Sequence, residues 1–166
     1  MRMSISNRIS LAILLTAFVP LAYWGRMEGA EFPRHINFLT GTPDVWGTRN
    51  ELFILLGIAT LIYVLLVLSC KYPQMMNYNS FRLGKLSIGK KRIGKEDKEK
   101  LYPIGIELAQ RMNILLMMLF SLTTNCSSLM AIGVIGKFPV YCIWISLACI
   151  LGLAIKFTVQ IRKMTE

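Results

Sequence analysis

The sequence predicts an all-α membrane protein with four transmembrane helices and a small structured loop between the first two. Hydrophobic residues make up 54% of the chain and charged residues only 17%, whereas roughly a quarter of a soluble domain is charged. The apolar residues form long blocks, and the charges, which sum to +10, lie between them. These features exclude an ordinary water-soluble enzyme domain. They also favour anionic lipid over nucleic acid as the partner of the basic segments.

Four charge-free stretches are long enough, or nearly so, to span a bilayer. A spanning helix needs about 20 apolar residues, because the hydrocarbon core is about 30 Å thick and a helix rises about 1.5 Å per residue. The stretches are 9–25, 52–70, 112–136 and 138–155. Because only residues 136–139 separate the apolar parts of the last two, we expect them to form an antiparallel hairpin.

The first stretch resembles a signal peptide, since Arg2 and Arg8 precede an apolar run. The residues after it lack the small-x-small pattern of a cleavage site. Tyr23 and Trp24 are typical of the aromatic belt at a membrane interface. The prediction is an uncleaved helix, with a cleaved signal as the alternative.

The distribution of cations predicts the orientation. Fifteen of the 19 Lys and Arg residues lie in the two tails and in segment 71–111, and the other four lie in loop 26–51 and in the turn before the last helix. Positively charged segments stay in the cytoplasm. We therefore expect both termini, including tail 156–166, inside and loop 26–51 outside.

The loop between the first two helices begins with an alternating pattern. Arg34, Ile36 and Phe38 alternate with His35 and Asn37. Alternation of this kind is typical of extended backbone, with the two polar side chains on one face.

A turn and a helix start follow in the same loop. Gly41, Pro43 and Asp44 predict the turn, because Pro fixes φ and Asp can bond its own backbone. Thr48 and Glu51 fit a capping box that opens the second helix. The result would be a compact cap packed on the outer membrane face. Its expected apolar contacts are Phe32, Ile36, Phe38, Val45 and Trp46.

This loop resembles a known family. The order Pro-x-His-x-Asn-x-x-x-Gly-x-Pro-Asp-x-Trp-Gly over residues 33–47, with a hydrophobic helix on each side, is similar to domain of unknown function 1648. That domain occurs in SdpI-type bacterial membrane proteins, a family named for an immunity protein against a secreted peptide toxin. The resemblance covers roughly residues 11–78, with Tyr72-Pro73 and Asn77-Tyr78 as its last matching pieces.

The resemblance implies a non-enzymatic protein of the bacterial cytoplasmic membrane. Its role would be that of a sensor or immunity-type protein, whose outer loop meets a peptide or another membrane protein. The candidate binding residues are His35, Asn37, Gly41, Pro43, Asp44 and Trp46.

His35 is the only histidine, and a metal site or a pH sensor around it is one interpretation. A structural zinc site needs four N or S ligands, whereas this loop offers one imidazole and no thiol. Neither a hydrolase triad nor an HExxH motif occurs, so we expect no metal, no cofactor and no enzymatic activity. Two interpretations stay open: the polar side chains bond the loop backbone, or they form a recognition surface.

The third stretch carries polar residues on one helical face: Ser121, Thr124, Asn125 and Ser128. Such residues usually bond to neighbouring helices. The alternative is a polar path in a small transporter or accessory subunit. No Asp, Glu, Lys or Arg lies in the four stretches, and this favours helix packing.

Segment 81–100 is basic and is broken by Gly84, Gly89 and Gly94. It contains no phosphate-binding loop. We expect a topology determinant held near anionic headgroups, each cation contributing about 1 kcal/mol, with docking of a partner as the alternative. Pro103 is expected to begin an amphipathic helix that leads into the third span.

Overall fold

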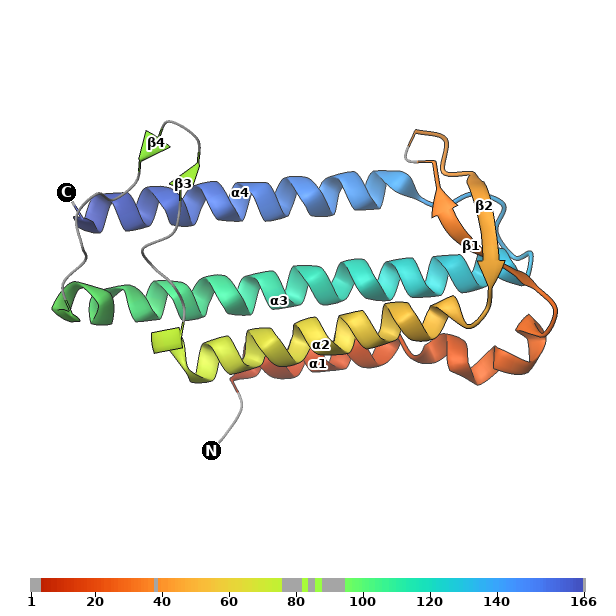
Figure 1. The fold of residues 1–166 in the computed structure, drawn as a ribbon, viewed down its shortest axis with the longest axis horizontal. Coiled ribbons are helices and arrows are strands. Elements are labelled where there is room, and N and C mark those ends of the chain that lie inside the picture. The colour runs from red at the N-terminus through yellow and green to blue at the C-terminus, as the bar shows by residue number, and fades with distance from the viewer. Residues whose placement is uncertain (1–3, 38, 76–81, 84–85, 88–94, 166) are drawn as a thin grey trace.

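In the computed structural model the chain forms a bundle of long helices with a β-hairpin at one end (Figure 1). The structure describes residues 4–37, 39–75, 82–83, 86–87 and 95–165. The helices are α1 (Ile5–Thr16), η1 (Val19–Met27), α2 (Glu51–Lys71), η2 (Pro73–Met75), α3 (Lys95–Ala131) and α4 (Val140–Thr165). The strands are β1 (Glu31–Ile36), β2 (Pro43–Thr48), β3 (Arg82–Leu83) and β4 (Leu86–Ser87). Helix α3 lies in the middle, with α1 and α2 on one side and α4 on the other.

Within the described residues, four helical segments are long and apolar enough to cross a membrane. They are Ile5–Met27, Glu51–Lys71, Glu99–Ala131 and Val140–Gln160, with mean hydropathies of 1.6, 2.8, 1.6 and 2.1. This confirms the predicted helical class and indicates a multi-pass membrane protein.

The first helix differs from the predicted span 9–25. It begins at Ile5, because the Ser4 side chain caps it by accepting a hydrogen bond from the Asn7 amide at 3.2 Å. The α-helix ends at Thr16, and a 3₁₀-helix follows. Pro20 stands at the start of that 3₁₀-helix, and its missing N–H breaks the α-helical hydrogen bonds there.

Helix α2 closely matches the predicted span 52–70, but the expected capping box is not formed. Thr48 belongs to β2, where it pairs with Glu31, so it lies outside the helix terminus. The N-cap is Asn50, whose side chain makes no capping bond. The Glu51 carboxylate instead lies 3.6 Å from the Arg34 guanidinium.

Helix α3 begins well before the predicted span 112–136, and Pro103 lies inside it instead of opening it. The missing Pro103 N–H frees only the carbonyl of Glu99, and Glu99 is an exposed residue. The helix ends at Ala131, because Gly133 adopts φ +74°. Val134 N and Gly133 N then donate to the carbonyls of Leu129 and Met130, which is the pattern of a Schellman cap.

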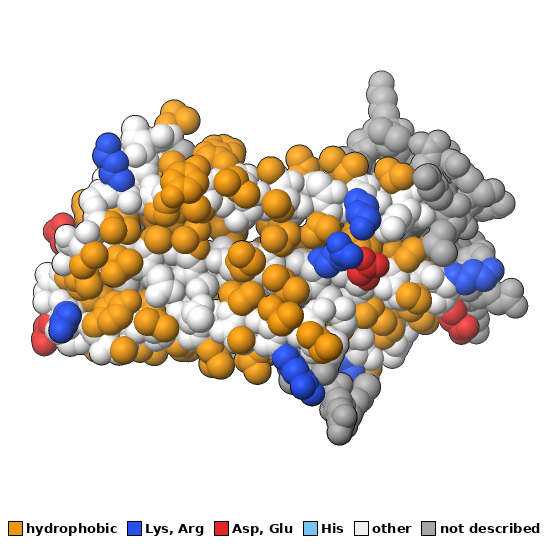
Figure 2. Space-filling view, turned by 180° about the vertical axis from the view of Figure 1, so that it is seen from behind, with side chains coloured by type: hydrophobic (Ala, Val, Ile, Leu, Met, Phe, Trp, Pro, Cys, Tyr) orange, Lys and Arg blue, Asp and Glu red, His pale blue; other side chains and the backbone are white. Residues whose placement is uncertain are grey.

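Helix α4 runs antiparallel to α3, as predicted (Figure 1). It is longer than the expected span 138–155, and the connection is 132–139 instead of 136–139. Only 6% of its apolar stretch is buried. Figure 2 shows hydrophobic side chains over most of the length of the helices on the face it displays. In a bilayer such a surface faces lipid.

The buried apolar residues form clusters along the bundle. Near the hairpin, Phe32 packs with residues of η1 and α2. In the middle, Leu14, Tyr63 and Met117 join α1, α2 and α3. A further cluster around Phe138 joins α3 to the start of α4. The hairpin thus lies on a packed helical base.

Candidate functional site

The loop between α1 and α2 forms an antiparallel β-hairpin. The predicted extended backbone is present, and β2 is its partner. The Cα partners are Glu31–Thr48, Phe32–Gly47, Pro33–Trp46, His35–Val45 and Ile36–Pro43. The expected turn at Gly41, Pro43 and Asp44 is wrong in part, because Pro43 and Asp44 belong to β2. The turn instead lies between Asn37 and Thr42, where Asn37 supplies its hydrogen bonds.

Asn37 organises the turn. Its side-chain Oδ1 accepts hydrogen bonds from the amides of Leu39 and Thr40, at 2.9 and 3.3 Å. Its backbone carbonyl accepts from Gly41 N at 2.8 Å, and its own amide donates to the Thr42 carbonyl at 2.9 Å. Of the two interpretations of the polar loop residues, hydrogen bonding to the loop backbone is therefore the one that applies to Asn37.

Gly41 joins the hairpin tip to the helices. It adopts φ +73°, a conformation that favours glycine. Phe138 N donates to the Gly41 carbonyl at 2.7 Å, and a Cβ at Gly41 would collide with the Phe138 carbonyl oxygen. Ile36 packs beside the same Phe138 cluster. The tip is therefore held against the α3–α4 connection.

His35 and Asp44 form a hydrogen-bonded pair across the two strands. The Nδ1 and Oδ1 atoms lie 2.5 Å apart. Both side chains stay about half exposed, at 58% and 48%. This pair is an accessible polar feature of an ordered hairpin, and it can present a charge or a hydrogen bond to a partner.

Trp46 and Val45 make few of their contacts within the protein. Of their surfaces, 44% and 46% are exposed on β2, so contact of these two side chains with the outer membrane face stays a prediction. Phe32, by contrast, is fully buried as expected. The difference arises because β1, not β2, lies against the end of α3. Phe38 lies outside the described residues.

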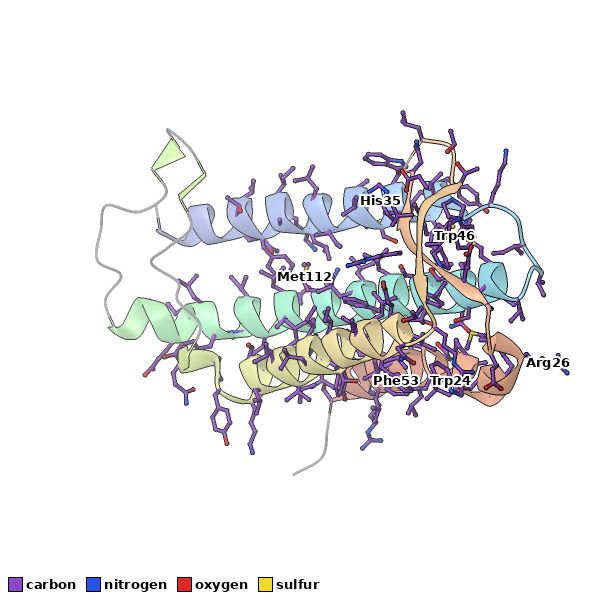
Figure 3. The ribbon with its side chains drawn as sticks, turned by 45° about the vertical axis from the view of Figure 1, so that its right-hand side comes forward. Trp24, Arg26, His35, Trp46, Phe53 and Met112 are labelled. Carbon is purple, nitrogen blue, oxygen red and sulfur yellow. The ribbon has the colours of Figure 1, made fainter. Side chains whose placement is uncertain are left out.

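The base of the hairpin is tied to the helices by an arginine that the sequence analysis missed. Arg49 lies over the Trp24 ring, 4.6 Å from its centre, and Nη1 donates to the Trp24 carbonyl at 3.1 Å. The Trp24 and Phe53 rings lie side by side, 4.8 Å apart (Figure 3). Trp24 belongs to the expected aromatic belt, and a cation can lie over such a ring. Nothing in the sequence shows that Arg49 is that cation.

The polar face of α3 contacts α1. Ser121 Oγ lies 2.6 Å from Thr16 Oγ1, and Asn125 Nδ2 donates to the Thr16 carbonyl at 2.9 Å. Thr124 and Ser128 are fully buried and bond carbonyls of their own helix. These four residues are therefore used in helix packing.

Metal ligation finds no support in the described part of the chain. Among residues 4–37, 39–75, 82–83, 86–87 and 95–165, no three His, Cys, Asp or Glu side chains gather closely enough to hold an ion. Half of the basic segment 81–100 lies outside these ranges, including Gly84, Gly89 and Gly94. Of its described pieces, β3 and β4 pair antiparallel, and residues 95–100 form the start of α3.

The sequence matches no protein-family model, no curated protein and no solved structure. The geometry of the hairpin and the resemblance of its sequence are therefore the grounds for a function.

Proposed function

We propose that this chain is a non-enzymatic sensor or immunity-type protein of the bacterial cytoplasmic membrane, which recognises a peptide or another membrane protein through the β1–β2 hairpin. The observation that carries the proposal is the His35–Asp44 pair, half exposed on an ordered hairpin. Function is often placed on ordered loops that a rigid scaffold presents. The resemblance of the loop to SdpI-type proteins supplies the class of role.

The hairpin suits recognition because it is held at both ends. Its tip bonds Phe138 through Gly41, and Arg34 and Arg49 contact the helices at its base. A surface fixed in this way loses little conformational entropy when a partner binds. The half-exposed Trp46 adds the kind of aromatic side chain that is enriched in interfaces.

The test is protection of cells against membrane-active peptides. Cells with and without the protein are challenged with peptides from related bacteria, and survival and membrane potential are measured. We expect His35→Ala and Asp44→Ala to reduce protection to the level of cells that lack the protein. Exposed ion pairs contribute only about 0–1 kcal/mol to stability, so the amount of protein should not change.

Val134→Ala is the matched control, because Val134 is exposed in the α3–α4 connection and lies outside the hairpin. It should protect like the unmodified protein. If the unmodified protein protects against none of the peptides, the immunity-type role is wrong.

A small transporter or accessory subunit is the alternative function. It would use Asn125 and its neighbours to line a path. The hydrogen bonds from Asn125 and Ser121 to Thr16 favour packing instead, so we do not extend the proposal to transport. Transport would predict a substrate flux that is lost in Asn125→Leu.

A further inference from the structure

Two carboxamides lie inside the helical bundle without protein partners. The Asn113 side chain is fully buried, and in the described part of the chain neither Oδ1 nor Nδ2 meets a hydrogen-bond partner. The Asn7 side chain is 6% exposed, and its Oδ1 has no partner there either. Buried polar groups in folded proteins are almost always satisfied, and no described protein group satisfies these three atoms.

The register of α1 against α3 puts the two asparagines at the same level. The helices run parallel (Figure 1). Gln110 Nε2 donates to Ser4 Oγ at 3.2 Å across a sequence separation of 106. The Thr16–Ser121 bond nearer the hairpin has a separation of 105. Asn113 follows Asn7 by the same 106 residues, and both belong to the buried sides of their helices.

Helix α2 contacts α1 beside Asn7. The Tyr63 hydroxyl donates to the Asn7 carbonyl at 3.3 Å. Below the two asparagines lies the Ser4–Gln110 bond, and above them lie Leu14 and Met117 of the middle cluster. The orphan atoms are therefore enclosed by α1, α2 and α3.

We propose that Asn7 and Asn113 together bind one buried water molecule between α1 and α3. The orphan atoms are two acceptors, the Oδ1 atoms, and one donor, Asn113 Nδ2. A water molecule donates two hydrogen bonds and accepts at least one, so it satisfies all three atoms. Three bonds is also the usual number for a buried water.

The same donor set disfavours a metal ion. A cation would be attracted to the two Oδ1 atoms but repelled by the Nδ2 hydrogens. The polar side chains that hydrogen bonds place around the site, Ser4, Tyr63 and Gln110, carry no negative charge to balance it. An uncompensated charge in this interior would be far more costly than a neutral molecule.

The experiment is a measurement of water contacts at asparagine side chains by NMR. The full chain, labelled with ¹⁵N-asparagine, is placed in detergent micelles, and cross-relaxation between water and each side-chain NH₂ group is recorded. We expect a long-lived water contact at Asn113. Asn125 is the internal control, because its Nδ2 already donates to Thr16 and Ser121 carbonyls and should show none.

Two outcomes would overturn the proposal. One is the absence of a water contact at Asn113, in particular if its NH₂ shows a direct contact with Asn7 instead. The other is an unchanged contact at Asn113 in Asn7→Leu, since water held without Asn7 would not be shared between the two helices. The first comparison uses the unmodified protein, so it does not depend on how any variant folds.

Discussion

The hairpin depends on one close backbone approach, that of Gly41 to Phe138. Both the positive φ of Gly41 and the space beside its Cα require a residue without Cβ. Gly29 shares the same φ of +73° but has no atom within 4 Å of the position that a Cβ would occupy. A comparison of substitutions at the two glycines therefore separates the cost of the left-handed backbone from the cost of a clash with Phe138.

Gly41→Ala should destabilise the protein more than Gly29→Ala does. A left-handed alanine costs about 1–2 kcal/mol, and this is the whole effect that we expect at Gly29. At Gly41 a clash with the Phe138 carbonyl is added, and overpacking costs about 1–3 kcal/mol more. Unfolding by denaturant in micelles measures both. Equal losses for the two variants would show that the tip does not depend on this contact.

The residues of the candidate site were partly predictable. Polar side chains and a glycine between two apolar helices indicate an ordered loop, and alternation indicates extended backbone. The sequence does not reveal that Asn37 supplies the turn while His35 pairs with Asp44. His35 and Asn37 occupy equivalent positions in the alternating pattern, and only the pairing of β1 with β2 gives them different partners. The exposure of Trp46 likewise depends on which strand contacts α3.

Among the elements, the break in α1 and the polar face of α3 are linked. In an α-helix the N–H of residue 20 would bond the carbonyl of residue 16, but Pro20 has no N–H. Asn125 of α3 donates to that same Thr16 carbonyl at 2.9 Å. A side chain from one helix thus satisfies a backbone group that a proline leaves open in another.

Asn125→Leu should therefore destabilise the protein less when Pro20 is also replaced by alanine. Alone, we expect it to lower the free energy of unfolding by about 0.6–2 kcal/mol, the range for hydrogen bonds between membrane helices. With Pro20→Ala the backbone N–H can satisfy Thr16, so most of that loss should disappear. Unfolding of the four proteins in a double-mutant cycle measures the coupling.

Thr123→Val is the control for this cycle. The Thr123 hydroxyl bonds the Leu119 carbonyl within α3, so its removal should cost the same whether or not Pro20 is replaced. Equal costs of Asn125→Leu in the two backgrounds would refute the link between the proline and the asparagine.

The helices themselves were largely predictable because each contains a run of apolar residues close to the thickness of a bilayer. Their ends were not. The first turns of α1 and the N-terminal part of α3 are polar. Ser4 caps α1, and Gln110 of α3 contacts Ser4. Hydropathy does not reflect such contacts, so the spans that it predicts end where the first charged residue occurs.

At the scale of the whole molecule, the fold separates two ends. The N-terminus, the C-terminus and the β3–β4 region lie at one end of the bundle, and the β1–β2 hairpin and the α3–α4 connection lie at the other (Figure 1). In the sequence, fifteen of the 19 Lys and Arg residues belong to the tails and to segment 71–111, and the other four belong to loop 26–51 and to the α3–α4 connection. The chain segments that meet at the hairpin end are therefore the ones with few cations.

This distribution of cations predicts the topology of the chain in the membrane. A reporter that is active only outside the cytoplasm should be active after Gly29 and after Gly136, and inactive after Gly89. Cations resist translocation, and the two active positions lie at the hairpin end of the bundle, where few of them occur. A second reporter that is active only inside should give the opposite pattern. Activity after Gly89 outside the cell would invert the orientation and place the His35–Asp44 pair in the cytoplasm, where no secreted peptide could meet it.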